Sequence, residues 1–268
     1  MLEISNFEEI IQVRMSREMD GKPLFRVAAY LIDGLLIDTG CSYTASELLG
    51  YLEQNPPQMV VNTHFHEDHI GANRLIRERL GIEIYAHSDS LRLIGQPAKL
   101  FPYQEIVWGY PDPSGVGSIP SLIHTGRFTF EVIETPGHSV GHIVLLERSK
   151  GWCFCGDIYA SDKVKTIRPE EDMGATAASI KKLAETETDR LILFTSAGGI
   201  IENGRESLKR YIKYLEDLSR KAKDLQSQGQ TVQEIMTGIF GGEHKRALMT
   251  DGQYTTENLI RSVLKMER

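Results

Sequence analysis

Cysteine is scarce in this chain, with three residues in 268. An odd and small number of cysteines in a long chain argues against a disulfide framework, so we expect reduced thiols. Cys153 and Cys155 lie two apart on a predicted strand and could ligate a soft metal, but packing as small hydrophobes is the favoured interpretation. Cys41 follows IDTG in a predicted turn and indicates no chemistry.

The chain also lacks an excess of positive charge and long apolar runs. Lysine and arginine number 30 against 37 aspartates and glutamates, which gives a net charge of −7. Without a basic excess the chain has no evident surface for a polyanion, so nucleic acid is not the expected partner. No apolar run approaches a membrane span, and the amino-terminal segment is acidic where a secretory signal would be basic and then apolar. We therefore expect a cytoplasmic protein that acts on a small molecule without contacting a membrane, with formation of a homo-oligomer left open.

The order of the apolar segments predicts a mixed α/β protein. The length of 268 residues and the apolar content of 41% suit one large domain, or one with a helical appendage. Apolar runs and turn signals predict strands at residues 24–38, folded at the Asp33-Gly34 turn, and at 58–62, 82–85, 119–157 and 190–195. Helical periodicity and capping residues predict helices at 42–54, 70–80, 88–94, 174–186, 208–225, after Thr231 and at 254–266.

Residues 95–120 interrupt this pattern. They contain five prolines and four glycines among the aromatic residues Phe101, Tyr103, Trp108 and Tyr110. A loop of this length without secondary structure of its own is usually functional or disordered, and the aromatic residues favour an ordered segment. We expect a wall or lid of a site here rather than an irregular surface loop.

The strongest signal is a cluster of histidines directly after a predicted strand. Three of the eight histidines and an aspartate lie close together in HFHEDH, as His64, His66, Asp68 and His69. Alternate side chains of an extended segment share a face, so His64 and His66 can converge on one ion. Asp68 and His69 lie where the chain bends into a helix and can point at a second ion beside the first. The pattern predicts a metal site rather than a solvated polar loop.

Two further candidate ligands lie at the ends of predicted strands. His138 follows a Pro-Gly turn after FEVIE, and Asp157 closes CFCGDI. A lone histidine or aspartate at a strand end is more often a turn residue. The presence of the histidine cluster favours a shared metal centre instead.

With these residues the chain resembles the metallo-β-lactamase superfamily over roughly residues 10–200. The resemblance rests on LIDTG, THFHEDHIG, TPGHSVGH and GD in that order. It implies a four-layer αββα sandwich, in which two mixed β-sheets lie between helices and metals bind at one edge. It also implies a metallo-β-lactamase-like domain at residues 1–202 and a C-terminal helical extension at 203–268 packed on the same domain. The implied first-metal ligands are His64, His66 and His138, the second-metal ligands are Asp68 and His69, and Asp157 bridges the two.

One position departs from the family pattern. Relatives usually supply a last histidine to the second metal from the turn after the strand that reads LILF here, and Ala197 occupies that position. An alanine cannot bind metal, so the second site loses a nitrogen donor and gains room for water or substrate. Three outcomes are open: a weakly held second metal, a second metal completed by solvent, or activity from the first metal alone. His244 is expected at the surface rather than as a replacement ligand.

The resemblance and the donor set imply hydrolysis. A zinc-type cation lowers the pKa of bound water from about 15.7 to roughly 7. We expect one or two divalent cations, zinc first and iron or manganese as alternatives, with Asp68 as the catalytic residue that steers or shuttles the proton of the water. The predicted reaction is attack of metal-bound hydroxide on an ester, thioester, lactone or amide carbonyl of a small molecule. A weakened second site would favour good leaving groups.

Three other functions are open at this point. Some relatives with helical extensions cleave RNA phosphodiesters, some oxidise sulfur compounds with a single iron, and Ala197 could mark a catalytically impaired member of the family. The lack of a nucleic-acid module speaks against the nuclease. Metal analysis would separate iron from zinc.

The remaining polar residues of the motifs have supporting roles in this interpretation. His142 is expected to pack behind the ligands or to donate a hydrogen bond to them. Asp38 of LIDTG either braces the metal loop or shapes its own turn. His87 and His124 lie outside the motifs and are treated as ordinary polar residues.

Overall fold

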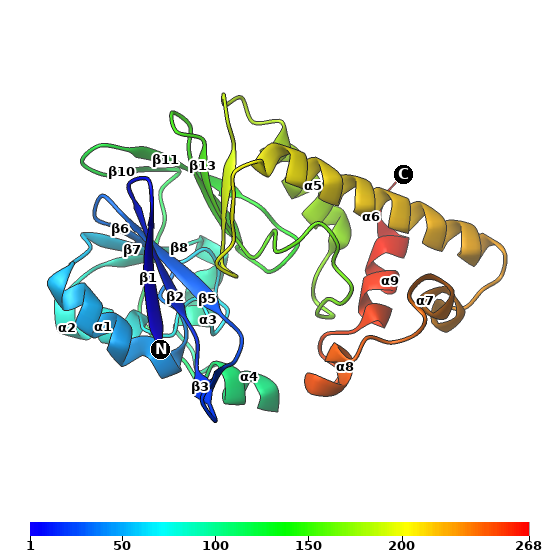
Figure 1. Ribbon diagram of the computed structural model, residues 1–268, viewed down its shortest axis with the longest axis horizontal. Helices are drawn as coiled ribbons and strands as arrows, with labels where there is room; N and C mark the ends of the chain where they lie inside the picture. Colours follow the sequence, from blue (N-terminus) through cyan, green and yellow to red (C-terminus); the bar gives the residue numbers. More distant parts are fainter. Residues whose placement is uncertain (268) are drawn as a thin grey trace.

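Two large mixed sheets form the centre of the computed structural model, which describes residues 1–267 (Figure 1). The first sheet has seven strands in the order β1 (Leu2–Phe7), β2 (Ile10–Met15), β5 (Val27–Ile32), β6 (Leu35–Ile37), β7 (Met59–Val61), β8 (Ile84–Ala86) and β9 (Gly117–Ser118). The second has six strands in the order β10 (Leu122–His124), β11 (Thr129–Glu134), β12 (Ile143–Glu147), β13 (Trp152–Gly156), β14 (Ile192–Thr195) and β15 (Ile200–Ile201). A small ribbon of β3 (Glu18–Met19) and β4 (Lys22–Pro23) extends from the first sheet (Figure 1).

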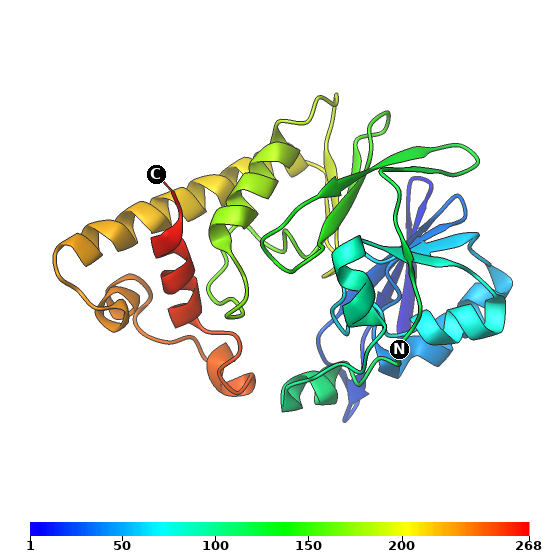
Figure 2. The same cartoon turned by 180° about the vertical axis from the view of Figure 1, so that it is seen from behind.

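Helices cover the outer faces of both sheets (Figures 1 and 2). Along the first half of the chain they are the 3₁₀ turns Ser42–Thr44 and Ser88–Ser90 and the helices α1 (Ala45–Gln54), α2 (Asn73–Leu80), α3 (Leu91–Ile94) and α4 (Pro102–Val107). Along the second half they are α5 (Met173–Ala184), α6 (Gly204–Ser227), α7 (Val232–Phe240), α8 (Arg246–Met249) and α9 (Thr256–Lys265). The result is helix, sheet, sheet, helix, so the predicted αββα sandwich is confirmed.

The sandwich follows from the alternation of side chains along buried strands. In β5 all six residues are buried, because each face of the strand meets a different apolar layer. Val27, Ala29 and Leu31 belong to the cluster shared with α1 and α2. Ala28, Tyr30 and Ile32 belong to the cluster between the two sheets. A strand buried on both faces has no polar positions, which is why LFRVAAYLI is an almost continuous apolar run.

Aromatic rings fill the space between the sheets. Phe154 of β13 stacks on Phe194 of β14 with ring centroids 4.8 Å apart, and Tyr30 of the first sheet contacts both rings edge-on. The Tyr30 hydroxyl donates a hydrogen bond of 2.6 Å to the carbonyl of Thr195. This contact fixes the end of β14, and therefore the turn that carries Ala197, against the first sheet.

The segment 95–120 differs from its prediction as a loop without secondary structure. It contains α4, which begins at Pro102, and strand β9. Proline fits the first position of a helix because its missing N–H needs no partner there. The Gln104 side chain accepts a hydrogen bond of 2.8 Å from the backbone N–H of Phe101 and caps the helix. The high proline and glycine content concealed a helix of only six residues.

The C-terminal helices pack on the second sheet through one apolar cluster. The buried face of α6 includes Leu208, Leu215 and Ala222, as the helical stripe in the sequence predicted. The same cluster contains residues of β12, β13, α5 and α9. The capping box predicted at Thr231 is present, since its hydroxyl accepts from the Glu234 N–H and the Glu234 carboxylate accepts from the Thr231 N–H. Among residues 1–267, no helix combines the length and apolarity that crossing a membrane requires.

We predict that the buried face of α6 contributes strongly to stability. Leu215 is fully buried, so Leu215→Ala should lower the free energy of unfolding by about 2–5 kcal/mol, the usual cost of such a cavity. Leu248 is 88% exposed, and the matched change Leu248→Ala should cost less than about 0.5 kcal/mol. Urea unfolding at fixed metal content measures both. Equal effects of the two changes would show that α6 does not share the core.

Candidate metal centre

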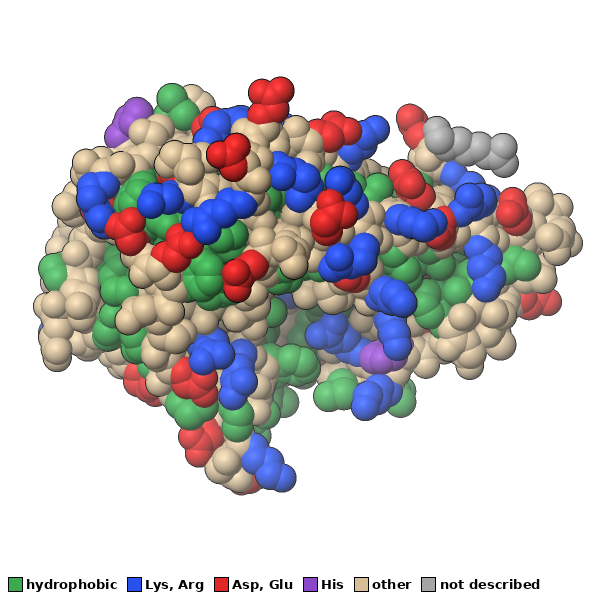
Figure 3. All heavy atoms as spheres, turned by 45° about the horizontal axis from the view of Figure 1, so that its top comes forward, with side chains coloured by type: hydrophobic (Ala, Val, Ile, Leu, Met, Phe, Trp, Pro, Cys, Tyr) green, Lys and Arg blue, Asp and Glu red, His purple; other side chains and the backbone are tan. Residues whose placement is uncertain are grey.

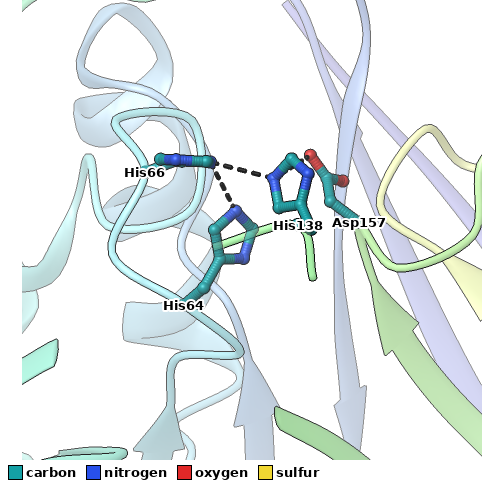
Figure 4. A group of neighbouring side chains, drawn as sticks. All are labelled: His64, His66, His138 and Asp157. Atoms are coloured by element: carbon teal, nitrogen blue, oxygen red, sulfur yellow. Dashed lines mark hydrogen bonds and ion pairs between the residues drawn. The ribbon is translucent and has the colours of Figure 1, made fainter. Parts of the chain in front are cut away.

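Three buried histidines from distant segments point toward one another. His64 and His66 lie in the loop after β7, and His138 lies in the turn between β11 and β12. The Nδ1 atom of His66 lies 2.9 Å from Nε2 of His64 and 3.0 Å from Nε2 of His138 (Figure 4). Asp157 reaches the same group from the end of β13, with Oδ2 3.5 Å from Nε2 of His138. The structure thus brings together the four residues expected around a first metal.

This group fits a divalent cation. Burial lowers the pKa values of His64 and His66 well below the usual range for histidine, so both rings are neutral and present a lone pair. In a tetrahedral site with Zn–N bonds of about 2.0–2.1 Å, ligand nitrogens lie about 3.3 Å from one another. The distances of 2.9 and 3.0 Å from Nδ1 of His66 to the other two nitrogens are close to that value. Three imidazoles and a carboxylate are a donor set that suits zinc and related ions.

A second group lies beside the first and shares Asp157. Its members are Asp68, His69 and Asp157. Nε2 of His69 lies 3.6 Å from Oδ1 of Asp157 and 3.9 Å from Oδ2 of Asp68. Within residues 1–267, neither His69 Nε2 nor Asp68 Oδ1 has a hydrogen-bond partner, although both atoms are buried. Unpaired buried donors and acceptors are costly, and a cation would satisfy them.

Asp38 holds the histidine loop in place. Its carboxylate accepts hydrogen bonds of 2.8 Å from the Thr63 backbone N–H, the Thr63 hydroxyl and Nδ1 of His69. Because Nδ1 of His69 donates to Asp38, its Nε2 atom faces the second group. Nδ1 of His64 lies 3.1 Å from the Thr63 hydroxyl, which leaves Nε2 for the first group in the same way. Of the two roles considered for Asp38, the structure shows the bracing role.

The other ligand-bearing turns have equivalent supports. Glu171 lies 3.2 Å from Nδ1 of His138 and so directs Nε2 of that ring toward His66. His142 packs behind the ligands, the first of its two expected roles, with its ring centroid 5.1 Å from that of His64, and it accepts a hydrogen bond of 3.2 Å from the backbone N–H of Asp157. Burial lowers the pKa of His142 to about 3, which keeps Nε2 free to accept. Gly156 is required here, because a Cβ would lie 2.7 Å from that Nε2 atom and the backbone φ is +48°.

Opposed charges shift the pKa values of the second group. Burial alone would lower the pKa of His69, but Asp38, Asp68 and Asp157 together raise it well above its usual value. Burial alone would raise the pKa of Asp157, but His69 and His138 hold it well below its usual range. Burial raises the pKa of Asp68 to about 7. When no cation is bound, the His69 ring and the Asp68 carboxylate therefore hold protons.

Ala197 lies at the cavity beside Asp157 and offers no donor. The neighbouring Ser196 hydroxyl forms a short hydrogen bond to Oδ1 of Asp157. Serine gave no signal in the sequence, because a hydroxyl in a turn has many local partners. Glu171 was missed for a related reason, since it lies outside every motif and reaches His138 only through the packing of the segment before α5.

A cavity of about 420 Å³ opens from the metal groups and is large enough for a small-molecule substrate. Tyr103 and Trp108 line it, so segment 95–120 forms part of its wall, as predicted. Tyr254, just before α9, faces it from the C-terminal side. His244 also lines the cavity and is half-buried, and neither metal group found among residues 1–267 includes it. His87 and His124 lie elsewhere, paired with Glu134 and Thr129.

Buried Arg168 adds a permanent positive charge that the sequence analysis did not identify. Its guanidinium lies 3.6 Å from Glu67 and donates a hydrogen bond of 2.8 Å to the Tyr254 hydroxyl. Gln104 of α4 donates a hydrogen bond of 2.6 Å to the same Glu67 carboxylate. This network joins the histidine loop, α4 and the start of α9 around the cavity.

Comparisons with known proteins agree with this geometry. Hydroxyacylglutathione hydrolase GloC of Haemophilus influenzae is 24% identical over 56% of this chain and 72% of its own length. The hydroxyacylglutathione hydrolase of Pectobacterium atrosepticum is 30% identical over 59% of this chain, and the match spans about half of that relative, at 55%. A solved metallo-beta-lactamase family protein of Thermus thermophilus matches 96% of this chain and 91% of its own, with a TM-score of 0.66 and 16% identity, which supports the fold.

Both of these sequence relatives are named as hydrolases, which confirms the predicted hydrolase class. The family model of the metallo-beta-lactamase superfamily matches residues 23–214, which is most of the chain. The chain therefore belongs to the metallo-beta-lactamase superfamily, as its four motifs predicted.

Proposed function

We propose that this chain hydrolyses an activated acyl bond of a small molecule, a thioester first and an ester or lactone next, with zinc as the preferred cation. The observation that carries the proposal is the group of His64, His66, His138 and Asp157, two of which line a cavity. Ala197 lies in the same lining and supplies no donor to the second metal group. The donor set favours zinc among divalent ions, with iron as the main competitor. Hydrolysis of an acyl bond needs a nucleophile, a proton carrier and a leaving group.

A divalent cation held by these residues supplies Lewis acidity that activates water near neutral pH and polarises a carbonyl. The protein's own contribution begins with orientation. Asp38 and Glu171 each accept from Nδ1 of a histidine and so fix the direction of its Nε2 atom. Asp68 lines the cavity, and its buried Oδ1 atom has no hydrogen-bond partner among residues 1–267. It is placed to accept the proton of the attacking water and to pass it to the leaving group.

Because Ala197 supplies no metal ligand, stabilisation of the leaving group should be weakened most. A thiolate is a weaker base than an alkoxide, with a thiol pKa of about 8.5, and needs less stabilisation to depart. A centre with a weakened second site should therefore cleave thioesters better than oxygen esters or amides. Two relatives are named for an acylated thiol, hydroxyacylglutathione, which is consistent with this order.

We predict that metal removal abolishes hydrolysis of an acetyl thioester and that zinc restores it. Exhaustive chelation should leave less than about 1% of the activity, because general acid–base catalysis alone contributes far less than the cation. His66→Ala should lose bound metal and activity together. The exposed His124→Ala is the matched control and should keep both. Full activity in chelated protein, or oxidation of a thiol in place of hydrolysis, would contradict the proposal.

Ala197→His should convert the second group into a complete site. We expect at least about tenfold tighter binding of the second zinc equivalent, since a neutral imidazole replaces solvent. Activity on oxygen esters should rise relative to thioesters. Ala197→Leu, which adds volume without a donor, is the control and should not bind the second ion more tightly. Elemental analysis and a zinc titration measure the stoichiometry, and an unchanged second affinity in Ala197→His would refute this role.

Zinc affinity should rise with pH across the neutral range. Glu171 and Asp157 outweigh burial and raise the pKa of His138, and the pKa of His69 is raised further still. A histidine with a raised pKa keeps its proton to higher pH, so affinity is lost as the pH falls through that value. Calorimetry at pH 7 in two buffers of different ionisation enthalpy should show proton release on zinc binding. Binding without proton release would mean that these rings are already neutral.

A further inference from the structure

The cavity carries a charge opposite to that of the whole chain. The chain has a net charge of −7, yet five basic residues line the cavity, namely Arg26, Lys163, Lys165, Arg168 and Arg246. The three acidic residues that line it, Asp68, Asp157 and Glu171, all belong to or support the metal groups. Figure 3 shows basic side chains gathered on the right-hand wall of the hollow between the two halves of the molecule. The wall away from the metal groups is therefore positive.

Two of these cations have acidic partners and contribute little net charge. Arg26 lies 3.4 Å from Glu3, and Arg168 lies 3.6 Å from the buried Glu67. For the other three, no carboxylate lies within ion-pair distance among residues 1–267. Lys163, Lys165 and Arg246 form what we call the cationic wall.

The fold presents the two lysines in a defined direction. They lie two apart in the segment between β13 and α5, and both line the cavity. Val164 between them packs on the apolar cluster of the second sheet, while both lysines are exposed. The Tyr214 hydroxyl donates to the Val164 carbonyl, and Ile167 pairs with Thr255 just before α9. The C-terminal helices thus fix the segment that carries the lysines.

Arg246 reaches the cavity from α8. Its guanidinium lies 4.8 Å from the centre of the Tyr254 ring and 5.7 Å from that of Phe25, and all three residues line the cavity. An aromatic face holds a guanidinium without neutralising it, so the charge remains available to a ligand. Trp108 lines the cavity as well and packs near Phe25, with ring centroids 6.3 Å apart. The cationic wall is therefore flanked by aromatic surface.

We propose that the cationic wall binds an anionic group of the substrate, a carboxylate or a phosphate, while the acyl bond lies at the metal groups. The inference rests on the proposed function and deepens it, because it defines the substrate as an anionic thioester or ester with an apolar portion. Unpaired cations in a chain of net negative charge select anions by local attraction, and the aromatic residues contact the apolar portion of the molecule.

The test uses three acetyl thioesters of one short thiol chain that ends in a carboxylate, a phosphate or a neutral carboxamide. The variant Lys163→Gln/Lys165→Gln removes the two lysines. The variant Lys209→Gln/Lys213→Gln removes the same charge from the exposed face of α6, away from the cavity, and is the matched control. Steady-state kinetics at low and high salt give KM and kcat separately for each zinc-loaded protein.

We expect the wild type and the control to have a lower KM for an anionic probe than for the carboxamide. In Lys163→Gln/Lys165→Gln, the KM for the anionic probe should rise about tenfold, a typical effect of losing two partly exposed charges, with kcat and the carboxamide KM unchanged. High salt should also raise the wild-type KM for the anionic probe toward that for the carboxamide. The preferred anionic probe identifies carboxylate or phosphate as the natural group. Equal KM values for charged and neutral probes, or equal effects of the two double variants, would overturn the proposal.

Binding of the non-hydrolysable thioether analogues separates this inference from the proposed function. If no thioester is cleaved, the proposed function fails, but calorimetry still compares the anionic and neutral analogues in the same three proteins. Preferential binding of an anionic analogue that Lys163→Gln/Lys165→Gln weakens would keep the anion site. No such preference would reject it.

Discussion

The hydrogen bonds of one buried carboxylate, Asp38, are the constraint on which the metal centre depends. Its two oxygens bind the Thr63 backbone, the Thr63 hydroxyl and the His69 ring. These contacts fix the start of the histidine loop and the direction of His69 at once. Buried polar groups are stable only when paired, so His64, His69 and His138 each use one nitrogen for a support and keep the other for a cation. The Glu171–His138 pair repeats the arrangement on the opposite side.

This arrangement concentrates titratable groups that no apolar core would otherwise tolerate. The rings of His64 and His69 and the carboxylate of Asp157 lie within a few ångströms at the sheet edge, and the stacked pair of Phe154 and Phe194 lies on β13 and β14, the strands that lead to Asp157 and Ala197. The rigid aromatic layer resists relaxation of the loops. A cation therefore meets ligands that are already oriented. The opposing pKa shifts of His69 and Asp157 reflect charges that lie close together when no cation is bound.

The C-terminal helices shape the wall of the cavity that opens from the metal centre. Tyr254, just before α9, hydrogen-bonds Arg168 and lies beneath Arg246, while Tyr214 of α6 holds the segment of Lys163 and Lys165. The same helices complete the core of the second sheet. Stability and the shape of the cavity thus have a common origin, so changes on the buried face of α6 should also displace the cationic wall. Ala197 leaves space beside Asp157, where the acyl bond would lie.

The sequence by itself determined the mixed α/β class and the candidate ligands, because both depend on short-range patterns, and the family resemblance carried by its motifs implied the αββα sandwich. Continuous apolar strands such as β5 predict burial on two faces, and HxHxDH with His138 and Asp157 at strand ends predicts their convergence. Only the tertiary structure decided the rest. The supports Glu171 and Ser196, the helix α4 within segment 95–120, the position of His244 and the cationic wall all depend on segments far apart in the chain. A lysine such as Lys163 looks like any solvated residue until packing places it beside Arg246, because local sequence encodes the type of a side chain and not the neighbours that give it a role.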